Sequence, residues 1–288
     1  MRLSIQHRTA YTYQADVADS FNEVRLQPFN AGNQQLVSFQ LNVEPWAALN
    51  SYLDFYLNIV HFFDVTQPHN RLVIESRAEV ETLEDPRGEP TGLFPRTDLA
   101  EASLAENFHD FLCESDLITL GPQLRWCLEQ AIPTPTTDVW EAVSLILFWV
   151  YHNFQYNPQA THVHTRPEEV IDLRSGVCQD FAHVMIGMCR ANHIPARYVS
   201  GYFFDSTRDP GDNSQASHAW VETYIPKFGW LALDPTHNRI CDAQYVKIGI
   251  GRDYRDIRPV SGTYRGTDQR WMEVDVRVEQ VTQLGPSG

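Results

Sequence analysis

The chain has few cysteines, and they show no pattern that would build a disulfide framework. Its five cysteines, an odd number, lie scattered through 288 residues, and no two of them form a C-x-x-C pair. Disulfide-stapled secreted domains carry even numbers of closely spaced cysteines, and structural zinc sites carry paired ones. The pattern therefore indicates a reducing compartment, where a single thiol stays available for chemistry.

Positive charge and long apolar runs are also scarce. Lysine and arginine together number 22 against 37 aspartates and glutamates, which gives a formal net charge of −15. Nucleic acids and anionic membranes are bound mainly through clustered basic side chains, so this balance argues against both as partners. No apolar stretch reaches the roughly 20 residues that a membrane-spanning helix needs, and residues 1–7 alternate like a strand instead of forming a signal-peptide core. We expect a cytoplasmic protein.

The first part of the chain has the period-two alternation of apolar and polar side chains that is typical of β-strands. The clearest stretches are 3–13, 37–43, 59–65 and 72–83. They predict an antiparallel β-sandwich over residues 1–85. Residues 83–90, LEDPRGEP, combine two prolines, a glycine and charges without periodicity, as a linker does. We therefore expect a second domain, the catalytic one, over residues 86–288.

Helical patterns follow this linker. We expect helices over residues 99–113, 122–130 and 139–154, and a further short helix that begins near Thr165. Asp138 is placed as the N-cap of the third helix, and Glu141, three residues later, would complete a capping box. Strand patterns return after the helices, with a last alternating strand at residues 271–278 whose apolar side chains we expect to face inward. Segregated helices and strands predict an α+β fold.

The stretch from 175 to 201, SGVCQDFAHVMIGMCRANHIPARYVSG, predicts a buried helix followed by a strand. Apolar residues recur at helical spacing in its first half. Pro195 ends the helix, and residues 196–202 are rich in strand-forming side chains. Cys178 then lies at the helix N-terminus, where free backbone N–H groups and the helix dipole favour the nucleophilic thiolate.

Two partners for this thiol follow in SHAWVETYIPKFGWLALDPTHN. His218 begins one predicted strand, Asp234 ends the next, and residues 226–229 form the turn between them. A nucleophilic thiol needs a base, and the base needs a third group that fixes its orientation. Because side chains alternate along strands, the two partners share a face only if paired residue numbers add to an even total. We therefore predict an odd-length turn or a β-bulge in this hairpin.

The motifs GVCQDFAHVMIGMCRANHIPARYVSGY, HAWVETYIPKFGWLALDPTHN and IGRDYRDIRPVSGTYRG cover residues 175 to 266 almost without a gap. They resemble the transglutaminase-like superfamily of papain-type cysteine enzymes, in its bacterial branch with a β-rich N-terminal domain. The segments LSIQHRTAYTY, NEVRLQP and HNRLVIESRAEVE fit the same branch, which usually has a Gly-Asn turn where this chain reads Leu57-Asn58. The resemblance implies a papain-like core and a catalytic triad of Cys178, His218 and Asp234.

Acyl chemistry also needs donors for the oxyanion that forms on attack. The backbone N–H of Cys178 is one candidate by position. Relatives supply the second donor from an upstream indole, and here Trp140, Trp149 and Tyr156 are the upstream aromatics. We favour Tyr156, because the segment around it reads as a loop entering the site. Gln179 follows the nucleophile and is a candidate to line the substrate cleft.

The remaining histidines and acidic residues indicate no metal or cofactor. His162 and His164 have no cysteine or carboxylate nearby at a recurring ligand spacing, and no acidic cluster has the spacing of a calcium-binding loop. We interpret His183 and His193 as structural. His237 is interpreted as a loop residue that could bring a second imidazole near Asp234.

These features favour hydrolysis of a peptide or isopeptide bond through a thioester, as in a cysteine protease. The alternative is transamidation between a glutamine carboxamide and an amine, and a second alternative is a catalytically silent protein-binding scaffold. The polar segment 208–215, which precedes His218, would let water reach the thioester and so favours hydrolysis. The expected partner is a peptide or protein substrate.

Overall fold

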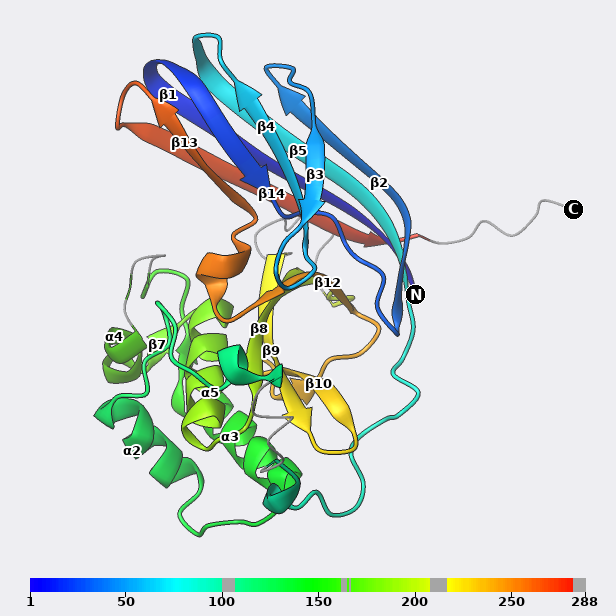
Figure 1. The fold of residues 1–288 in the computed structure, drawn as a ribbon, viewed down its shortest axis with the longest axis vertical. Helices are drawn as coiled ribbons and strands as arrows, with labels where there is room; N and C mark the ends of the chain where they lie inside the picture. The colour runs from blue at the N-terminus through cyan, green and yellow to red at the C-terminus, as the bar shows by residue number, and fades with distance from the viewer. Residues whose placement is uncertain (100–106, 162–164, 166, 208–216, 282–288) are drawn as a thin grey trace, which may run out of the picture.

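The structure is a computed structural model that describes residues 1–99, 107–161, 165, 167–207 and 217–281. The chain folds into two halves in contact with each other (Figure 1). One half is an antiparallel β-sheet, and the other packs helices against a second antiparallel sheet. The predicted α+β class is confirmed. No helix among these residues is both long and apolar enough to cross a membrane.

The N-terminal sheet has seven strands, with β2, β5, β1, β4 and β3 in that order and both β13 and β14 paired to β1. The strands are β1 (Arg2–Val24), β2 (Gln34–Glu44), β3 (Asn50–Leu53), β4 (Ile59–Val65), β5 (His69–Thr82), β13 (Val260–Arg265) and β14 (Arg270–Gln280).

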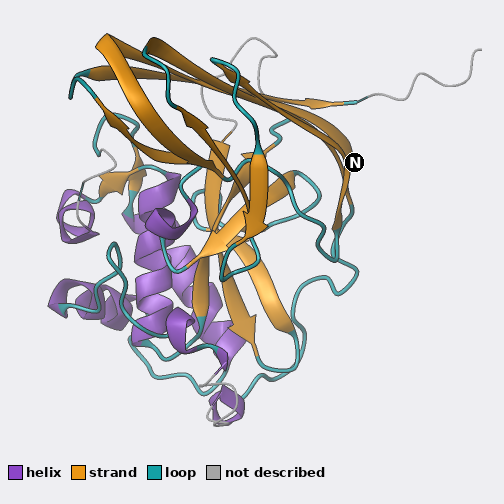
Figure 2. Cartoon of the chain, turned by 45° about the horizontal axis from the view of Figure 1, so that its top comes forward, coloured by secondary structure: helices purple, strands orange, loops and turns teal. Residues whose placement is uncertain are grey.

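Strand β1 is long enough to belong to two sections of this sheet. Residues 3–13 pair with β14, whereas residues 18–24 pair with β13, and register shifts between Thr12 and Val17 mark the change. Inward side chains from both sections, among them Leu3 and Val24, pack into one core. The sheet therefore curls around its own hydrophobic interior (Figure 2).

The last two strands return to this first sheet. The predicted domain boundary at residue 85 assigns residues 260–280 to the second domain. In the structure these residues pair with β1 of the first sheet. The prediction that the apolar side chains of the last strand face inward holds only in part. Val276 is 4% exposed, but Met272 and Val274 are 58% and 48% exposed, so only the second half of β14 contributes to the core.

The helical layer largely matches the prediction. Its helices are α2 (Pro122–Ala131), α3 (Val139–Asn153), α4 (Pro167–Leu173) and α5 (Cys178–Ala191). The side chain of Asp138 accepts a hydrogen bond from the Glu141 amide at 2.8 Å, which confirms the N-cap. The capping box is not completed, because the Glu141 carboxylate bonds to the Thr136 hydroxyl instead.

The predicted helix over residues 99–113 falls mainly on residues 100–106, which lie outside the described residues. Of the residues beside them, Asn107 is helical, and the 3-10 turns η1 (Arg96–Leu99) and η2 (His109–Phe111) lie on either side. Cys113 lies in a bend after η2 and not on a helix. Phe111 is the buried residue of η2.

The second sheet has the strand order β11, β10, β9, β8, β12. Its members are β8 (Ala196–Phe203), β9 (Ser217–Ile225), β10 (Gly229–Asp234), β11 (Arg239–Ile240) and β12 (Tyr245–Gly251), with the 3-10 turn η3 (Tyr254–Ile257) after it. Helix α5 packs on one face of this sheet and is covered on its other side by α2 and α3 (Figure 1). A Cβ atom on Gly187 would lie 2.8 Å from Leu124, so glycine permits the close approach of α2.

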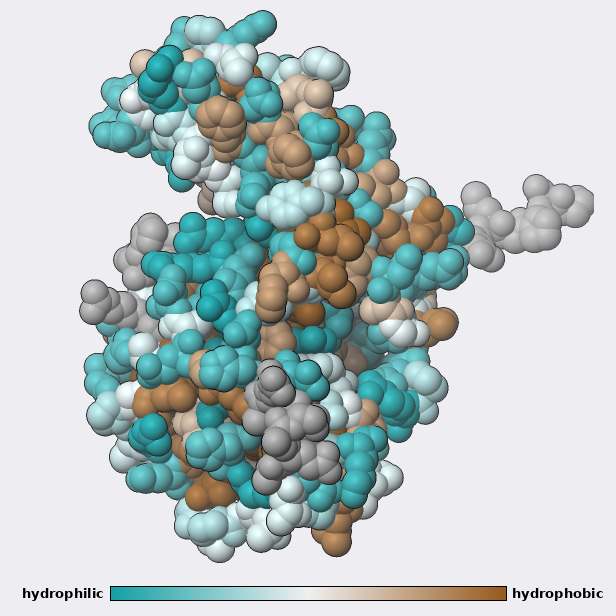
Figure 3. Space-filling model, viewed as in Figure 1, coloured by the Kyte–Doolittle hydropathy of each residue, from teal (hydrophilic) through white to brown (hydrophobic). Residues whose placement is uncertain are grey.

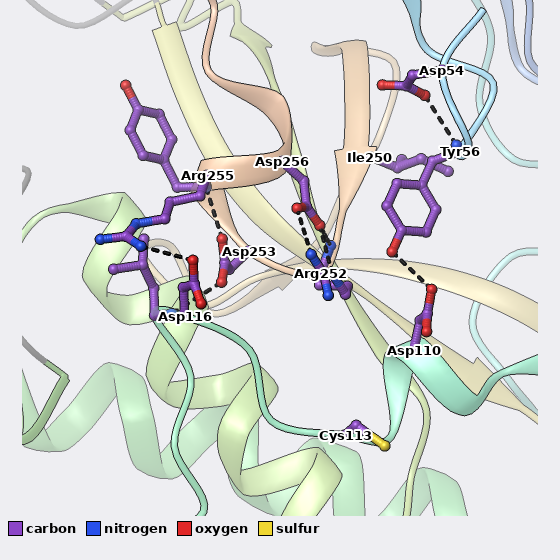
Figure 4. A network of polar contacts seen from close by, with 12 residues as sticks. Asp54, Tyr56, Asp110, Cys113, Asp116, Ile250, Arg252, Asp253, Arg255 and Asp256 are labelled. Carbon is purple, nitrogen blue, oxygen red and sulfur yellow. Dashed lines mark hydrogen bonds and ion pairs between the residues drawn. The ribbon is translucent and has the colours of Figure 1, made fainter.

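Polar contacts join the two halves. The His7 ring on β1 is 3.0 Å from the Tyr202 hydroxyl on β8, and the Asn58 side chain exchanges two 2.8 Å hydrogen bonds with the backbone of Ile250. Figure 4 shows the Tyr56 hydroxyl reaching Asp110 at 3.0 Å beside this contact. Leu57 has a positive φ of 65°, which explains why a glycine suits this turn in relatives.

An apolar surface remains uncovered beside the interface. Leu53, Phe55 and Leu57 around the β3–β4 loop are 61%, 83% and 70% exposed. The space-filling view shows apolar side chains gathered where the two halves meet (Figure 3).

Candidate active site

Cys178 is the first residue of α5, as predicted, and a buried carboxylate fixes the start of that helix. Val177 is the N-cap in extended geometry. The Asp180 side chain accepts hydrogen bonds from the Val177 amide at 2.8 Å and from the Thr161 hydroxyl at 2.6 Å. Asp180 therefore pairs with groups other than the thiol, as interpreted from the sequence.

Gly176 is required beneath this carboxylate. A Cβ atom there would lie 2.6 Å from Asp180 Oδ2 and 2.8 Å from the Asp180 Cβ. Contacts this short are essentially absent between real side chains, so a larger residue would displace the carboxylate from the helix start. The glycine two residues before the thiol thus helps to set the position of Cys178.

The hairpin of β9 and β10 brings the other two predicted residues onto one face. Gly229 pairs with Ile225 and Leu233 pairs with Val221, so the numbers of paired residues add to an even total. The loop between them is therefore the three residues 226–228, and Lys227 and Gly229 have positive φ values of 64° and 92°. The predicted odd-length turn is confirmed.

The three residues of the predicted triad meet at this face. His218 Nε2 lies 2.7 Å from Asp234 Oδ2, and the two side chains are 7% and 0% exposed. The Cys178 thiol lies near enough to the same imidazole to raise its pKa. Because Asp234 occupies Nε2, the nitrogen left for the sulfur is Nδ1. The order is thiol, imidazole, carboxylate, as in a nucleophile with an oriented base.

The Asp234 carboxylate accepts hydrogen bonds from several donors besides His218. Its Oδ2 atom also accepts the Tyr245 hydroxyl at 2.7 Å and lies 2.6 Å from His237 Nδ1. Its Oδ1 atom accepts the Thr236 amide at 2.8 Å. A fully buried carboxylate is stable as an anion only when its oxygens are satisfied in this way.

These contacts shift the protonation of the whole cluster. Burial alone would lower the pKa of His218, but the charges and hydrogen bonds of Asp234 and Cys178 raise it to about 10. Burial would likewise raise the pKa of the Asp234 carboxyl, yet the facing imidazole of His218, and after it that of His237, holds this pKa well below its usual range. The favoured state at neutral pH is an imidazolium held by a carboxylate and facing the sulfur.

The candidate oxyanion donors are backbone amides at the start of α5 and the side chain of Tyr156. The Val177 carbonyl accepts from the amides of Asp180 and Phe181, so the amides of Cys178 and Gln179 precede the first helical hydrogen bond. Gln179 is half-buried on this first turn. Tyr156 lies opposite Gly176 in a short parallel pair formed by β6 (Gln155–Tyr156) and β7 (Ser175–Gly176). Its role as the second donor stays a prediction.

Most other cysteines and histidines are structural, as interpreted from the sequence. Cys127 and Cys189 are fully buried, and His183 is buried and accepts the Tyr254 amide at 3.2 Å. Cys241, which the sequence could not place, is buried beside Asp234. His162 and His164 lie outside the described residues.

Two residues that contact Asp234 are not assigned to the site from the sequence. His237 is interpreted there as a loop residue, and Tyr245 is not singled out. His237 does lie in a turn, but it also contacts the carboxylate directly, and its position three residues after Asp234 is a signal that could have been given more weight. Tyr245 has no such signal. It reaches Asp234 because β12 returns to pair with β8, where Tyr245 lies opposite Phe203.

Comparison with known proteins gives a family for both halves of the chain. Residues 128–235 match the model of the transglutaminase-like superfamily. Residues 3–81 match the model of the bacterial transglutaminase-like N-terminal region. The two matches together include strands β1 to β5 of the N-terminal sheet, helix α5 and the His218–Asp234 hairpin.

Several relatives resemble the chain in sequence or fold. An uncharacterized protein of Mycobacterium tuberculosis is 33% identical over 294 residues, which cover 96% of this chain and 92% of the relative. A protein-glutamine gamma-glutamyltransferase of Pseudomonas aeruginosa is 36% identical over 88 residues, 29% of this chain and 13% of that one. The crystal structure of a candidate cysteine protease from Cytophaga hutchinsonii has a TM-score of 0.74 at 22% identity, covering 98% and 92% of the two chains.

Proposed function

Because the chain belongs to the transglutaminase-like superfamily, we propose that it is a cysteine-dependent acyl-transfer enzyme that acts on amide bonds of peptides or proteins. The observation that carries the proposal is the meeting of Cys178, at the N-terminus of a buried helix, with His218, whose imidazole is hydrogen-bonded to the buried Asp234 carboxylate. A thiol in this setting has the base, the orienting carboxylate and the helix-end amides that nucleophilic catalysis needs.

In the first step the sulfur of Cys178, whose proton is already held on His218 Nδ1 of the imidazolium, attacks the amide carbonyl carbon. A carbon–sulfur bond forms while the carbonyl π electrons move onto oxygen. The amides of Cys178 and Gln179 at the start of α5 are the groups placed to donate to that oxyanion. Asp234 stays ionised and stabilises the imidazolium that results.

In the second step the carbon–nitrogen bond breaks and His218 gives its proton to the departing amine. The acyl group is then held on Cys178 as a thioester. Water completes the reaction when His218 takes one of its protons and the oxygen attacks the thioester carbon, which expels the sulfur and releases a carboxylic acid. An amine in place of water would give a new amide by the same steps.

We propose hydrolysis as the main outcome. It is supported by the polar composition of residues 208–215, which precede His218 in the sequence and lie outside the described residues. Amine transfer is the second candidate, and the similarity to the Pseudomonas glutamyltransferase over 88 residues favours it. The two reactions share the Cys178 thioester and differ only in the acceptor.

One assay separates these outcomes. The protein is incubated with a peptide library and a labelled primary amine, and the products are identified by mass spectrometry against a Cys178→Ala control. Hydrolysed or deamidated peptides that exceed amine adducts support the proposal. Adducts that predominate at low millimolar amine would replace it with transamidation. If no product depends on Cys178, the chain is a binding scaffold and the proposal is wrong.

A further inference from the structure

The two imidazoles around Asp234 form a cluster of potential metal ligands. One ligand atom from each of His218, Asp234 and His237 lies within 4.8 Å of the other two. Both imidazoles approach the same carboxylate oxygen, at 2.7 Å and 2.6 Å. Two imidazoles and one carboxylate are a common protein ligand set of zinc, which leaves its fourth position to water.

The cluster is open to solvent on the side of His237. The His218 and Asp234 side chains are 7% and 0% exposed, but His237 is 38% exposed. His237 belongs to the turn that follows β10 and precedes β11, so its ring is less constrained than one in the middle of a strand. The Phe203 ring packs 5.6 Å from the His218 ring and 5.0 Å from the His237 ring, which gives the cluster an apolar wall.

We propose that His218, Asp234 and His237 bind a zinc(II) ion that inhibits the enzyme. The ion would take the place of the two N–H protons that now lie between the imidazoles and Asp234 Oδ2. Zinc–nitrogen and zinc–oxygen bonds of about 2.0–2.2 Å separate neighbouring ligand atoms by more than a hydrogen bond does. The His237 ring, on its turn, is the member that can move outward to make this space.

Inhibition follows from the proton that His218 retains. With Nε2 bound to zinc, the imidazole holds a hydrogen on Nδ1, the nitrogen that faces Cys178, and it gives up that hydrogen far less readily than an imidazolium does. His218 can then neither protonate the departing amine nor take a proton from the attacking water, so turnover stops. This inhibitory part depends on the proposed function, whereas the binding of zinc to the cluster does not.

The binding part is tested by isothermal titration of zinc(II) into the full chain, with magnesium(II) as the control ion because it prefers oxygen ligands. The informative variant is His237→Gln, since glutamine can still donate to Asp234 but is a poor zinc ligand. We expect its zinc affinity to fall by more than about tenfold, the loss that even a supporting residue of a metal site can cause. His152→Ala, an exposed histidine on α3, should leave the affinity unchanged.

The Cys178→Ala variant decides where the ion lies. The proposal expects nearly unchanged zinc affinity in it, because the sulfur is not a ligand. If zinc affinity is lost in Cys178→Ala and kept in His237→Gln, the ion sits on the thiol and the proposal is overturned. Absence of binding to the wild-type chain at micromolar zinc would overturn it as well. All variants are first compared by thermal unfolding.

A second readout addresses inhibition. Zinc should slow the Cys178-dependent hydrolysis of a library peptide in proportion to its occupancy, and His237→Gln should make that rate less sensitive to zinc. Zinc that binds while leaving the hydrolysis rate unchanged would overturn the inhibitory part. Zinc binding is measured without substrate, so a chain that proves to be a silent scaffold would refute the proposed function and leave the binding result intact.

Discussion

Cys178 differs from the other four cysteines in its immediate surroundings. The residue is half-buried, begins a helix and lies near enough to His218 to raise the pKa of that imidazole. Burial raises the pKa of Cys189 to about 12 and raises that of Cys241 well above its ordinary value. Cys113 is the cysteine whose reactivity is best compared with that of Cys178. It is also half-buried, and its Sγ lies 3.5 Å from His109 Nε2.

We therefore predict that limiting iodoacetamide alkylates Cys178 first, because the thiolate is the reacting form and an imidazolium and a helix end both favour it. Peptide mapping by mass spectrometry follows each thiol over time in the folded protein. His218→Ala should slow Cys178 and leave Cys113 unaffected. Equal rates at Cys113 and Cys178 in the wild-type chain would remove Cys178 as the nucleophile.

Tyr245 gives a second prediction at this scale. Tyr245→Phe removes one donor from the buried Asp234 carboxylate, and a hydrogen bond to a charged group is worth about 1.5–3 kcal/mol. We expect the free energy of unfolding to fall by about that amount in urea titrations. Activity should fall by no more than about tenfold, because His218 keeps its own bond to Asp234.

Tyr224→Phe is the matched control, since the Tyr224 ring packs on Phe108 and Trp230 away from Asp234. Tyr224→Phe should change neither the free energy of unfolding nor the activity appreciably. A Tyr245→Phe protein as stable as wild type would show that Asp234 does not depend on the phenol.

At the residue scale the sequence predicts which three residues lie together at the site, but not their surroundings. Cys178, His218 and Asp234 stand in motifs whose spacing carries information about the helix and the hairpin. Tyr245 reaches Asp234 only through the pairing of β12 with β8, and such a contact leaves no local pattern.

Among the elements, the start of α5 is the most sensitive to a small change. Gly176→Ala would place a Cβ 2.6 Å from Asp180 Oδ2, and the carboxylate would have to leave the Val177 amide. Loss of an N-terminal cap costs about 0.5–2 kcal/mol. A displacement of about 1 Å at a reacting group can cost about 100-fold in rate. We thus predict a modest loss of stability with a disproportionate loss of Cys178 reactivity.

The measurements are thermal unfolding and the alkylation rate of Cys178. Gly32→Ala is the control, because a Cβ there would meet nothing within 4 Å. It should change stability by less than about 0.5 kcal/mol. If Gly176→Ala keeps wild-type reactivity, Asp180 does not set the position of the thiol.

Element by element, periodicity predicts α2, α3 and the strands β8 to β10, because each buries one continuous apolar face. Periodicity does not predict which strand β13 and β14 pair with. Their alternation identifies strands, but the partner of a strand is decided by tertiary packing, and here the partner is β1, at the other end of the chain.

For the whole molecule, two buried histidines in different halves make stability depend on pH. His7 bonds across the interface to Tyr202, and His183 lies within α5. Burial lowers the pKa of each to about 4, against about 6.5 in an unfolded chain. Both stay neutral in the folded state at a pH where the unfolded state binds a proton, so stability is present above pH 6.5 and is lost as the pH falls toward 4.

We predict a loss of about 3 kcal/mol for each histidine across this window, since one pKa unit corresponds to about 1.36 kcal/mol. Urea unfolding at several pH values measures it. His7→Gln should reduce the slope and leave the contribution of His183. A free energy of unfolding that does not change between neutral pH and the lower end of this window would contradict the prediction.

The pairing of β1 with β14 also bears on how the protein is made. Residues 3–13 leave the ribosome ahead of the other strands of this sheet, and they can pair with β5 as soon as residue 82 follows. Their other edge pairs with residues 270–280, which are synthesised only after the complete His218–Asp234 hairpin. During translation β1 therefore presents an unpaired strand edge, the kind of surface on which nascent chains aggregate. We expect the N-terminal half to need protection by chaperones until residues 270–280 arrive, so that its maturation waits until β14 has been synthesised.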